Sequence, residues 1–235
     1  MPSPSAASTS TSSRTSQSTT RPTRVRMELT FQVATRMTRS YRGVRPHRIG
    51  DVTDARQQLI DYISAEAVFH GDFTLTSGKK ATYYVDLRKV SLDHRVAPLI
   101  GQVMLDLIAD IPDVSAVGGM TMGADPVAAA ILHQGAARGA EYDAFVVRKE
   151  PKDHGRGKQV EGPDLAGKRV IVLEDTSTTG GSPLKAVEAL EKVGAEIAAV
   201  AVVVDRATEA QERIEAAGYP YLAAIRLADL GLEAQ

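Results

Sequence analysis

The second half of the chain alternates between short apolar runs and segments whose apolar residues recur at helical spacing. Helices are expected to begin at about Asp125, Ser182 and Thr208, where the spacing changes to three or four residues. Strands that alternate with helices form a parallel sheet covered on both faces, and ligands bind beyond the carboxyl ends of its strands. We therefore expect an α/β fold with functional residues directly after the apolar runs, which cover residues 114–119, 143–148, 169–174, 197–205 and 221–227.

The pattern before this repeat is different. A helix is expected from about Asp54, where apolar residues share one face, and residues 95–109 predict another. Between these helices, residues 70–92 alternate aromatic and β-branched positions with polar ones around a Ser77-Gly78 turn. This alternation predicts one or two short antiparallel hairpins.

Two dipeptides in the second half predict where helices start. Asp125-Pro126 and Ser182-Pro183 each combine a good N-cap residue with a proline. Proline is favoured at the first helical position, because its missing N–H would have no partner there. We expect Asp125 and Ser182 to be the N-caps.

Composition narrows the class of protein. The chain has 235 residues, of which 43% are hydrophobic, enough for one sizeable core. It has no apolar run near the roughly 18 residues of a membrane helix and no signal-peptide pattern, so we expect a soluble, cytoplasmic protein. The chain has no cysteine, which excludes disulfides, thiolate metal sites and a cysteine nucleophile, and its five histidines lack metal-ligand spacing.

The charges are distributed unevenly. Residues 1–50 contain nine arginines and one acid, whereas the remaining residues carry an excess of nine acidic side chains. The opening segment is also rich in Ser and Thr, and such a composition cannot bury enough apolar surface to offset its ordering entropy. We predict a disordered extension over residues 1–50 and a folded domain over residues 51–235. The extension is interpreted as a solvated tail or upstream start, a transit peptide, or a nucleic-acid-binding arm.

The segment VIVLEDTSTTGGSPLKAVEAL, residues 170–190, joins a buried strand to a helix through acids, hydroxyls and glycines. Residues 178–182 would wrap the turn into the helix N-terminus, where unpaired N–H groups favour a phosphate. Glu174 and Asp175 would offer oxygens to sugar hydroxyls or to hydrated magnesium. The spacing matches a ribose 5-phosphate. A capped turn with solvated acids is the structural alternative.

A second cluster of charge lies in VVRKEPKDHGRGKQVEG, residues 146–162. Four potential cations fall within seven residues: Arg148, Lys149, Lys152 and His154. Cations on a glycine-flanked loop suit a pyrophosphate leaving group, whose charge grows as its bond to carbon breaks. A solvated basic loop is the alternative.

These segments resemble those of a known family. EDTSTTGGS is similar to the phosphoribosyl pyrophosphate (PRPP) motif of type I phosphoribosyltransferases, and RKEPKDHG resembles the mobile catalytic loop of the orotate phosphoribosyltransferases. FTLTSGKKATYYVDLR, residues 73–88, resembles the family segment that helps to enclose orotate. VVVDRA, residues 202–207, adds an arginine where the family holds orotate. The resemblance extends from about Asp51 to Leu232.

The resemblance implies a type I phosphoribosyltransferase core, a parallel sheet with a small N-terminal hood. It implies transfer of ribose 5-phosphate from PRPP to orotate, giving orotidine 5'-phosphate and pyrophosphate for UMP biosynthesis. It implies a homodimer that shares the loop around Lys152, and Mg²⁺ held mainly by PRPP, with no metal ligand set from the protein alone. The catalytic residues it implies are Lys152, His154 and Asp175; the PRPP-binding residues are Arg148, Lys149, Lys152, His154, Glu174, Asp175, Thr176, Ser177, Thr178, Thr179, Gly180, Gly181 and Ser182; and the orotate-binding residues are Thr178 and Arg206.

The chain departs from the family pattern at two places. Thr76 stands where the family often has a lysine, with Lys79 and Lys80 downstream. Thr121-Met122 replaces a Tyr-Lys pair in the second strand-to-helix loop. Two cationic contacts to substrate are therefore expected to be missing or supplied elsewhere.

Two alternative functions remain open from the sequence. The acceptor could be another nucleobase, such as a purine, although residues 73–88 and Arg206 argue against it. The protein could instead be a non-catalytic PRPP sensor that binds nucleic acid through its basic extension. Because the folded part is acidic and the extension lacks a helix-turn-helix pattern, a nucleic-acid partner is not expected.

Overall fold

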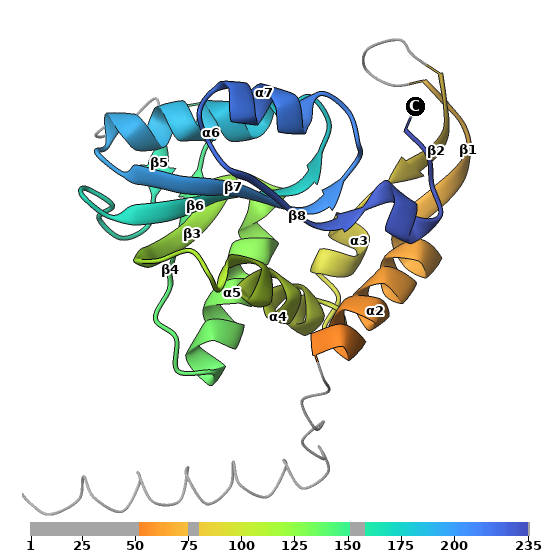
Figure 1. Ribbon diagram of the computed structural model, residues 1–235, viewed down its shortest axis with the longest axis horizontal. Helices are drawn as coiled ribbons and strands as arrows, with labels where there is room; N and C mark the ends of the chain where they lie inside the picture. The colour runs from red at the N-terminus through yellow and green to blue at the C-terminus, as the bar shows by residue number, and fades with distance from the viewer. Residues whose placement is uncertain (1–51, 75–79, 151–157, 235) are drawn as a thin grey trace, which may run out of the picture. The chain divides into compact units, whose positions relative to one another are not determined.

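The computed structural model describes residues 52–74, 80–150 and 158–234 (Figure 1). The extension predicted over residues 1–50 lies outside these described residues. Within them, none of the helices is both long enough and apolar enough to cross a bilayer.

The centre of the fold is a six-stranded sheet. Its strands follow the order β5-β4-β3-β6-β7-β8, and every neighbouring pair is parallel except β4 and β5. The expected parallel α/β sheet is therefore confirmed, with one antiparallel edge. The strands are β3 (Val114–Met120), β4 (Asp143–Val147), β5 (Val160–Glu161), β6 (Arg169–Ser177), β7 (Glu196–Asp205) and β8 (Tyr221–Arg226).

Helices cover both faces of this sheet (Figure 1). One face packs against α2 (Val52–Tyr62), α4 (Ala97–Ile108) and α5 (Ala124–Ala137), and the other against α6 (Gly181–Lys192) and α7 (Ala210–Ala216). Strand β7 shows why its sequence is apolar throughout: Ala201 and Val203 join the first core, whereas Val202 joins the second. Successive side chains of a strand point to opposite faces, so a doubly covered strand needs no polar positions.

A small hood stands beside the core. It consists of the antiparallel pair β1 (Val68–Thr74) and β2 (Lys80–Val85), which follows the short helix η1 (Ile63–Ala67) and leads into α3 (Arg88–Ser91). One hairpin is confirmed within the predicted residues 70–92, but residues 88–91 of that range form α3. The predicted Ser77-Gly78 turn and Thr76 lie outside the described residues. The C-terminal segment closes the hood, because η2 (Leu227–Leu230) packs on β2 and the Tyr83 hydroxyl donates to the Glu233 carbonyl at 2.7 Å.

The predicted N-caps are wrong. Helix α5 begins at Ala124 after Gly123, and α6 begins at Gly181 after Gly180, so Asp125 and Ser182 lie inside the first turns. Neither glycine provides a capping side chain. The free N–H groups of α6 therefore remain available to a ligand.

Three further boundaries differ from the sequence prediction. Strand β6 continues through Ser177, so the acids of the EDTSTTGGS motif lie on the strand itself. Residues 160–161 form an edge strand where a polar loop was expected, because they pair with the end of β4. Helix α7 begins at Ala210, two residues after the predicted start.

Candidate active site

The site lies where the strand order reverses. The chain passes from β3 to β4 on one side and then returns to β6 on the other side of β3. Loops at the ends of β3 and β6 therefore diverge and leave a crevice at the carboxyl edge of the sheet. A cleft of about 340 Å³ occupies this position, and the residues that line it include Tyr84, Asp86, Arg88, Thr121, Met122, Gly123, Lys149, Glu174, Asp175, Thr176 and Ser182.

Glu174 is the more buried of the two acids, with 8% of its surface exposed. Burial raises the pKa of its carboxyl well above the ordinary value, and the negative charge of Asp175 raises it further. The positive charge of Lys149 acts in the opposite direction and lowers the pKa. Glu174, Asp175 and Lys149 are therefore close enough to interact.

The carboxylate of Asp175 is held in place by its surroundings. Its Oδ1 atom accepts a hydrogen bond from the Thr176 N–H at 2.7 Å. A side chain at Gly123 would place its Cβ 2.6 Å from the same Oδ1, so only glycine lets the β3–α5 loop pass here. The carboxylate is therefore fixed at the wall of the cleft, and the charge of Asp175 also acts on Arg88 of the hood.

In the loop of residues 178–180, the carbonyls of Thr178 and Thr179 accept hydrogen bonds from side chains that follow β7. The Thr208 hydroxyl donates to the Thr178 carbonyl, and Arg213 Nη1 donates to the Thr179 carbonyl at 3.3 Å. Gly180 then adopts a left-handed conformation with φ 69°, which glycine allows at no steric cost. With its carbonyls bound elsewhere and its helix uncapped, this loop presents N–H groups and hydroxyls, a suitable environment for a phosphate.

Two hydrogen bonds fix the start of the basic loop, at Arg148. The Arg148 N–H donates to the Gln159 carbonyl at 2.8 Å, and the Gln159 side chain donates to the Arg148 carbonyl at 3.1 Å. Arg148 itself is exposed, whereas Lys149 lines the cleft. Lys152 and His154 lie outside the described residues, so their predicted roles remain predictions.

Several predicted residues are not part of the cleft lining: Arg148, Ser177, Thr178, Thr179, Gly180, Gly181 and Arg206. Ser177 and Arg206 have other partners. The Ser177 side chain is 1% exposed and bonds Asp205 and Tyr221 inside the protein, so only its main chain could contact PRPP. Arg206 follows β7 and lies close enough to Tyr83 of the hood to lower the pKa of that phenol, which burial raises. Its Nε atom is buried and has no hydrogen-bond partner within the described part of the chain.

Sequence reasoning missed several residues that line the cleft. Tyr84, Asp86 and Arg88 come from the hood, and Thr121 comes from the β3–α5 loop, where its hydroxyl donates to Asp125 at 2.6 Å. Arg88 closes the segment FTLTSGKKATYYVDLR, and Thr121 marks a departure from the family. Both positions were therefore visible in the sequence, but only the fold shows that they meet the acids of β6.

The fold and the site together define a class of protein. Residues 99–217 match the family model described as "Phosphoribosyl transferase domain". The architecture, a mostly parallel sheet with a hood beside its carboxyl edge, is the type I phosphoribosyltransferase fold.

Relatives of known identity narrow this class. The chain is 59% identical over 183 residues to the orotate phosphoribosyltransferase of Streptomyces coelicolor, covering 77% of this chain and 100% of the relative. It is 57% identical over 180 residues to that of Tropheryma whipplei (strain Twist), covering 77% of this chain and 84% of the relative. The chain belongs to the orotate phosphoribosyltransferases.

Solved structures agree. A crystal structure of Mycobacterium tuberculosis H37Rv orotate phosphoribosyltransferase in complex with Fe(III) dicitrate is 53% identical, with a TM-score of 0.69, and covers 76% of this chain and 99% of its own. A crystal structure of the same enzyme in complex with PRPP is 49% identical, with a TM-score of 0.66, and covers 76% of this chain and 99% of its own.

Proposed function

We propose that this chain transfers ribose 5-phosphate from PRPP to N1 of orotate, the step that forms the nucleotide in UMP biosynthesis. The bond from C1 of the ribose to pyrophosphate breaks as the bond to N1 forms, N1 of orotate gives up its proton to solvent, and orotidine 5'-phosphate and pyrophosphate leave. The observation that carries the proposal is the acid pair beside an uncapped helix N-terminus at the switch point of the sheet, in a chain that is 59% identical to an orotate phosphoribosyltransferase.

The donor half of the site consists of residues 174–182. The N–H groups and hydroxyls of Thr178, Thr179, Gly180, Gly181 and Ser182 would hold the 5-phosphate at the start of α6. Glu174 and Asp175 would accept hydrogen bonds from the ribose hydroxyls, and Thr176 fixes the Asp175 carboxylate through its N–H. Acids so near C1 also stabilise the positive charge of an oxocarbenium-like transition state.

The residues present fit a magnesium ion that arrives with PRPP. Carboxylate oxygens of Glu174 and Asp175 line the cleft, and Mg²⁺ prefers oxygen ligands. Within the described ranges, no group of three or more His, Asp or Glu side chains could hold a metal by itself. Magnesium would supply charge neutralisation to the pyrophosphate, and the two carboxylates would orient the complex.

The acceptor half consists of Arg206 and the hood. The Nε atom of Arg206 is buried and has no hydrogen-bond partner among the described residues. A carboxylate such as that of orotate would accept its hydrogen bond. Thr178 contributes from the donor side. Orotate becomes a nitrogen nucleophile when N1 loses its proton, so the protein mainly orients the two reactants.

The leaving group faces the basic loop. Lys149 lines the cleft, and its positive charge lowers the pKa of Glu174, so it would put positive charge beside the departing pyrophosphate. Arg148 begins the same loop. Lys152 and His154, which lie outside the described residues, would neutralise or protonate the pyrophosphate.

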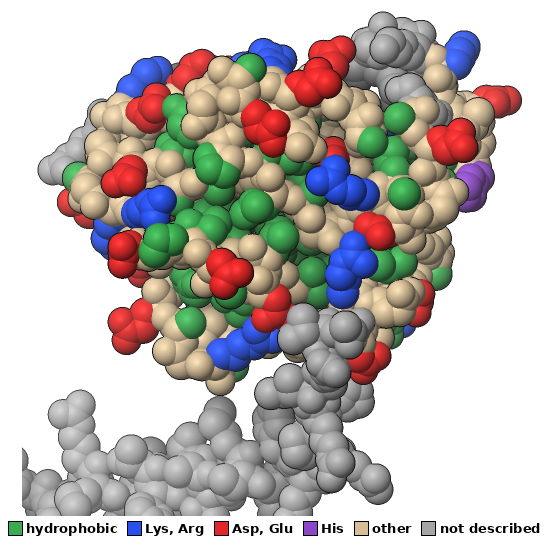
Figure 2. Space-filling model, viewed as in Figure 1, with side chains coloured by type: hydrophobic (Ala, Val, Ile, Leu, Met, Phe, Trp, Pro, Cys, Tyr) green, Lys and Arg blue, Asp and Glu red, His purple; other side chains and the backbone are tan. Residues whose placement is uncertain are grey.

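The regulator alternative gains no support from the folded part. The face in Figure 2 carries acidic and basic side chains side by side, without a basic stripe among its described residues. Retention of the segment RKEPKDHG in the sequence favours catalysis over sensing. A homodimer in the cytoplasm is part of the proposal, and sedimentation of the active preparation tests the dimer, because a particle of one 25.1 kDa chain would contradict it.

A panel of acceptors tests the function. The protein is incubated with PRPP, magnesium and one of orotate, adenine, hypoxanthine or uracil, and loss of the base is followed. We expect PRPP-dependent loss of orotate with release of pyrophosphate, and little change in the others. Consumption of another base without loss of orotate would overturn the assignment.

A further inference from the structure

A buried polar network joins the ends of three strands beside the site. Ser177 ends β6, Asp205 ends β7, and Tyr221 and Arg226 begin and end β8. The Ser177 hydroxyl lies 3.0 Å from Asp205 Oδ1 and 2.7 Å from the Tyr221 hydroxyl. Ser177 and Asp205 are only 1% and 2% exposed. Polar groups so deeply buried are costly unless they are fully bonded, so their placement in a sheet of aliphatic residues requires a reason.

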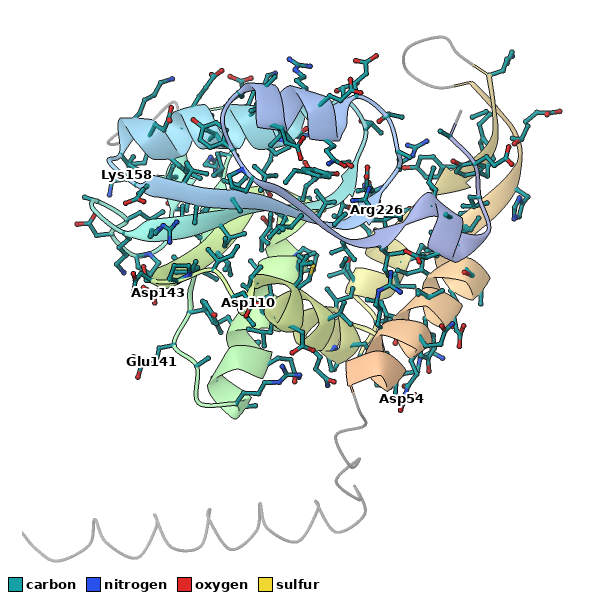
Figure 3. All side chains as sticks on the ribbon, in the orientation of Figure 1. Asp54, Asp110, Glu141, Asp143, Lys158 and Arg226 are labelled. Carbon is teal, nitrogen blue, oxygen red and sulfur yellow. The ribbon has the colours of Figure 1, made fainter. Side chains whose placement is uncertain are left out.

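The chemistry of the groups sets the direction of the hydrogen bonds. An ionised carboxylate only accepts, so the Ser177 O–H donates to Asp205, and the Tyr221 O–H donates to Ser177. Arg226 Nη1 donates to the second oxygen of Asp205 at 3.3 Å. Figure 3 shows Arg226 at the end of β8, on the side of the sheet nearer to the hood. The network is thus a chain that ends on one charged acceptor.

Asp205 also shapes the turn that carries Arg206. Its Oδ1 atom accepts the Ala207 N–H at 3.0 Å, two residues ahead in the chain. This contact closes an Asx-type turn around Arg206. Ala207 adopts a φ of 49°, an uncommon conformation for a residue with a side chain, which persists only where neighbouring contacts impose it. The main chain of Arg206 is therefore fixed by the same carboxylate that holds Ser177.

The donor loop begins at the other end of the network. Thr178 follows Ser177 directly, and its carbonyl accepts the hydroxyl of Thr208, which lies just beyond the Asx-type turn. The donor loop and the turn that carries Arg206 are thus tied together twice, once through Asp205 inside the sheet and once through Thr208 at its edge.

We propose that Tyr221, Ser177 and Asp205 form a positioning network that fixes the PRPP loop and the acceptor arginine relative to each other. None of these side chains is expected to touch substrate. Tyr221 acts first on the donor loop, through Ser177, and its contact with Asp205 is secondary, whereas Asp205 bonds both Ser177 and the turn that carries Arg206. The inference rests on the proposed roles of residues 178–182 and Arg206.

The test compares two tyrosines of one strand region. Tyr221→Phe removes the 2.7 Å bond to Ser177, and the control Tyr219→Phe removes a 2.7 Å bond to Glu191, which is on α6 outside the cleft lining. We expect Tyr221→Phe to raise the KM for PRPP about three- to tenfold, as the loss of one buried hydrogen bond would, with kcat nearly unchanged. Tyr219→Phe should leave both constants at the wild-type values.

Ser177→Ala provides a second measure. Combined with Tyr221→Phe, it should raise the KM for PRPP no more than the larger single effect, because both substitutions break one chain of bonds. Asp205→Asn should raise the KM for both PRPP and orotate. Fully additive effects, or a Tyr221→Phe enzyme with the KM values of Tyr219→Phe, would overturn the network. If the wild-type protein did not convert orotate at all, the proposed function would fail instead.

Discussion

The two halves of the site are built differently. The donor half is one continuous segment, residues 174–182, in which strand β6 places the acids and the start of α6 supplies N–H groups. The acceptor half joins Arg206 at the end of β7 to hood residues more than a hundred positions earlier in the chain. If these residues have the roles proposed above, a short motif encodes PRPP binding locally, whereas recognition of orotate depends on tertiary structure.

The sharpest way to break this contrast is to remove the fixed acid of the donor half. We predict that Asp175→Asn lowers kcat/KM by about a hundredfold or more, because the charge nearest the developing positive centre is lost. Steady-state kinetics measure the effect. The control Asp110→Asn alters an exposed acid before β3, labelled in Figure 3, and should retain wild-type rates. Equal losses in the two variants would contradict the assignment.

Arg206 tests the acceptor half. We predict that Arg206→Lys raises the KM for orotate about ten- to a hundredfold and leaves that for PRPP within a few-fold, because lysine cannot reproduce a forked pair with a carboxylate. Arg138→Lys, which alters a surface pair with Asp106 at 2.7 Å, is the control. A rise in the KM for PRPP alone would contradict the assignment of Arg206 to the acceptor half.

Gly180 tests how much the donor half depends on backbone conformation. Alanine at φ 69° costs about 1 to 2 kcal/mol, and its Cβ would also lie 3.3 Å from Ala210 and Ile214. We predict that Gly180→Ala lowers stability by about 2 kcal/mol and raises the KM for PRPP. Gly167→Ala has nearly the same φ, 70°, with open space around it, so it should cost less and leave KM unchanged. Denaturant unfolding compares them, and equal costs would refute the crowding argument.

Substitution of Glu174 should have the smallest effect, and it should raise the free energy of unfolding where Gly180→Ala lowers it. The folded pKa of Glu174 is raised, so ionisation in the unfolded chain, near the ordinary value of about 4.3, progressively destabilises the native state as pH rises towards the folded pKa. We predict that Glu174→Gln stabilises the ligand-free protein by about 1 kcal/mol at pH about 9 and by less at pH about 5. Glu188→Gln, an exposed change on α6, should show no such trend. A gain in stability that grew as the pH fell would contradict a raised pKa for Glu174.

The fold was largely predictable because apolar periodicity and the strand-helix alternation act locally. The element boundaries were less predictable. Gly123 and Gly180, rather than Asp125 and Ser182, are the N-caps of α5 and α6, since backbone geometry rather than side-chain preference sets these turns. Strand pairing also lengthened β6 and created β5, which depends on contacts distant in sequence.

The same division holds for the site. The position of Glu174 and Asp175 in the cleft could be predicted because both belong to one motif at the end of a strand. Arg88 and Thr121 could not, because they join the cleft only through the packing of the hood and the β3–α5 loop on the sheet. The side chain of Ser177 looked like part of the phosphate loop but faces Asp205 instead, since the strand continues through it.

Calorimetric titration of PRPP with magnesium tests most directly whether the two halves hold different substrates. We predict that, without orotate, Arg206→Lys binds PRPP with the wild-type Kd, whereas Asp175→Asn binds it about tenfold more weakly or worse. Equal PRPP affinities in the two variants would contradict the division of the site.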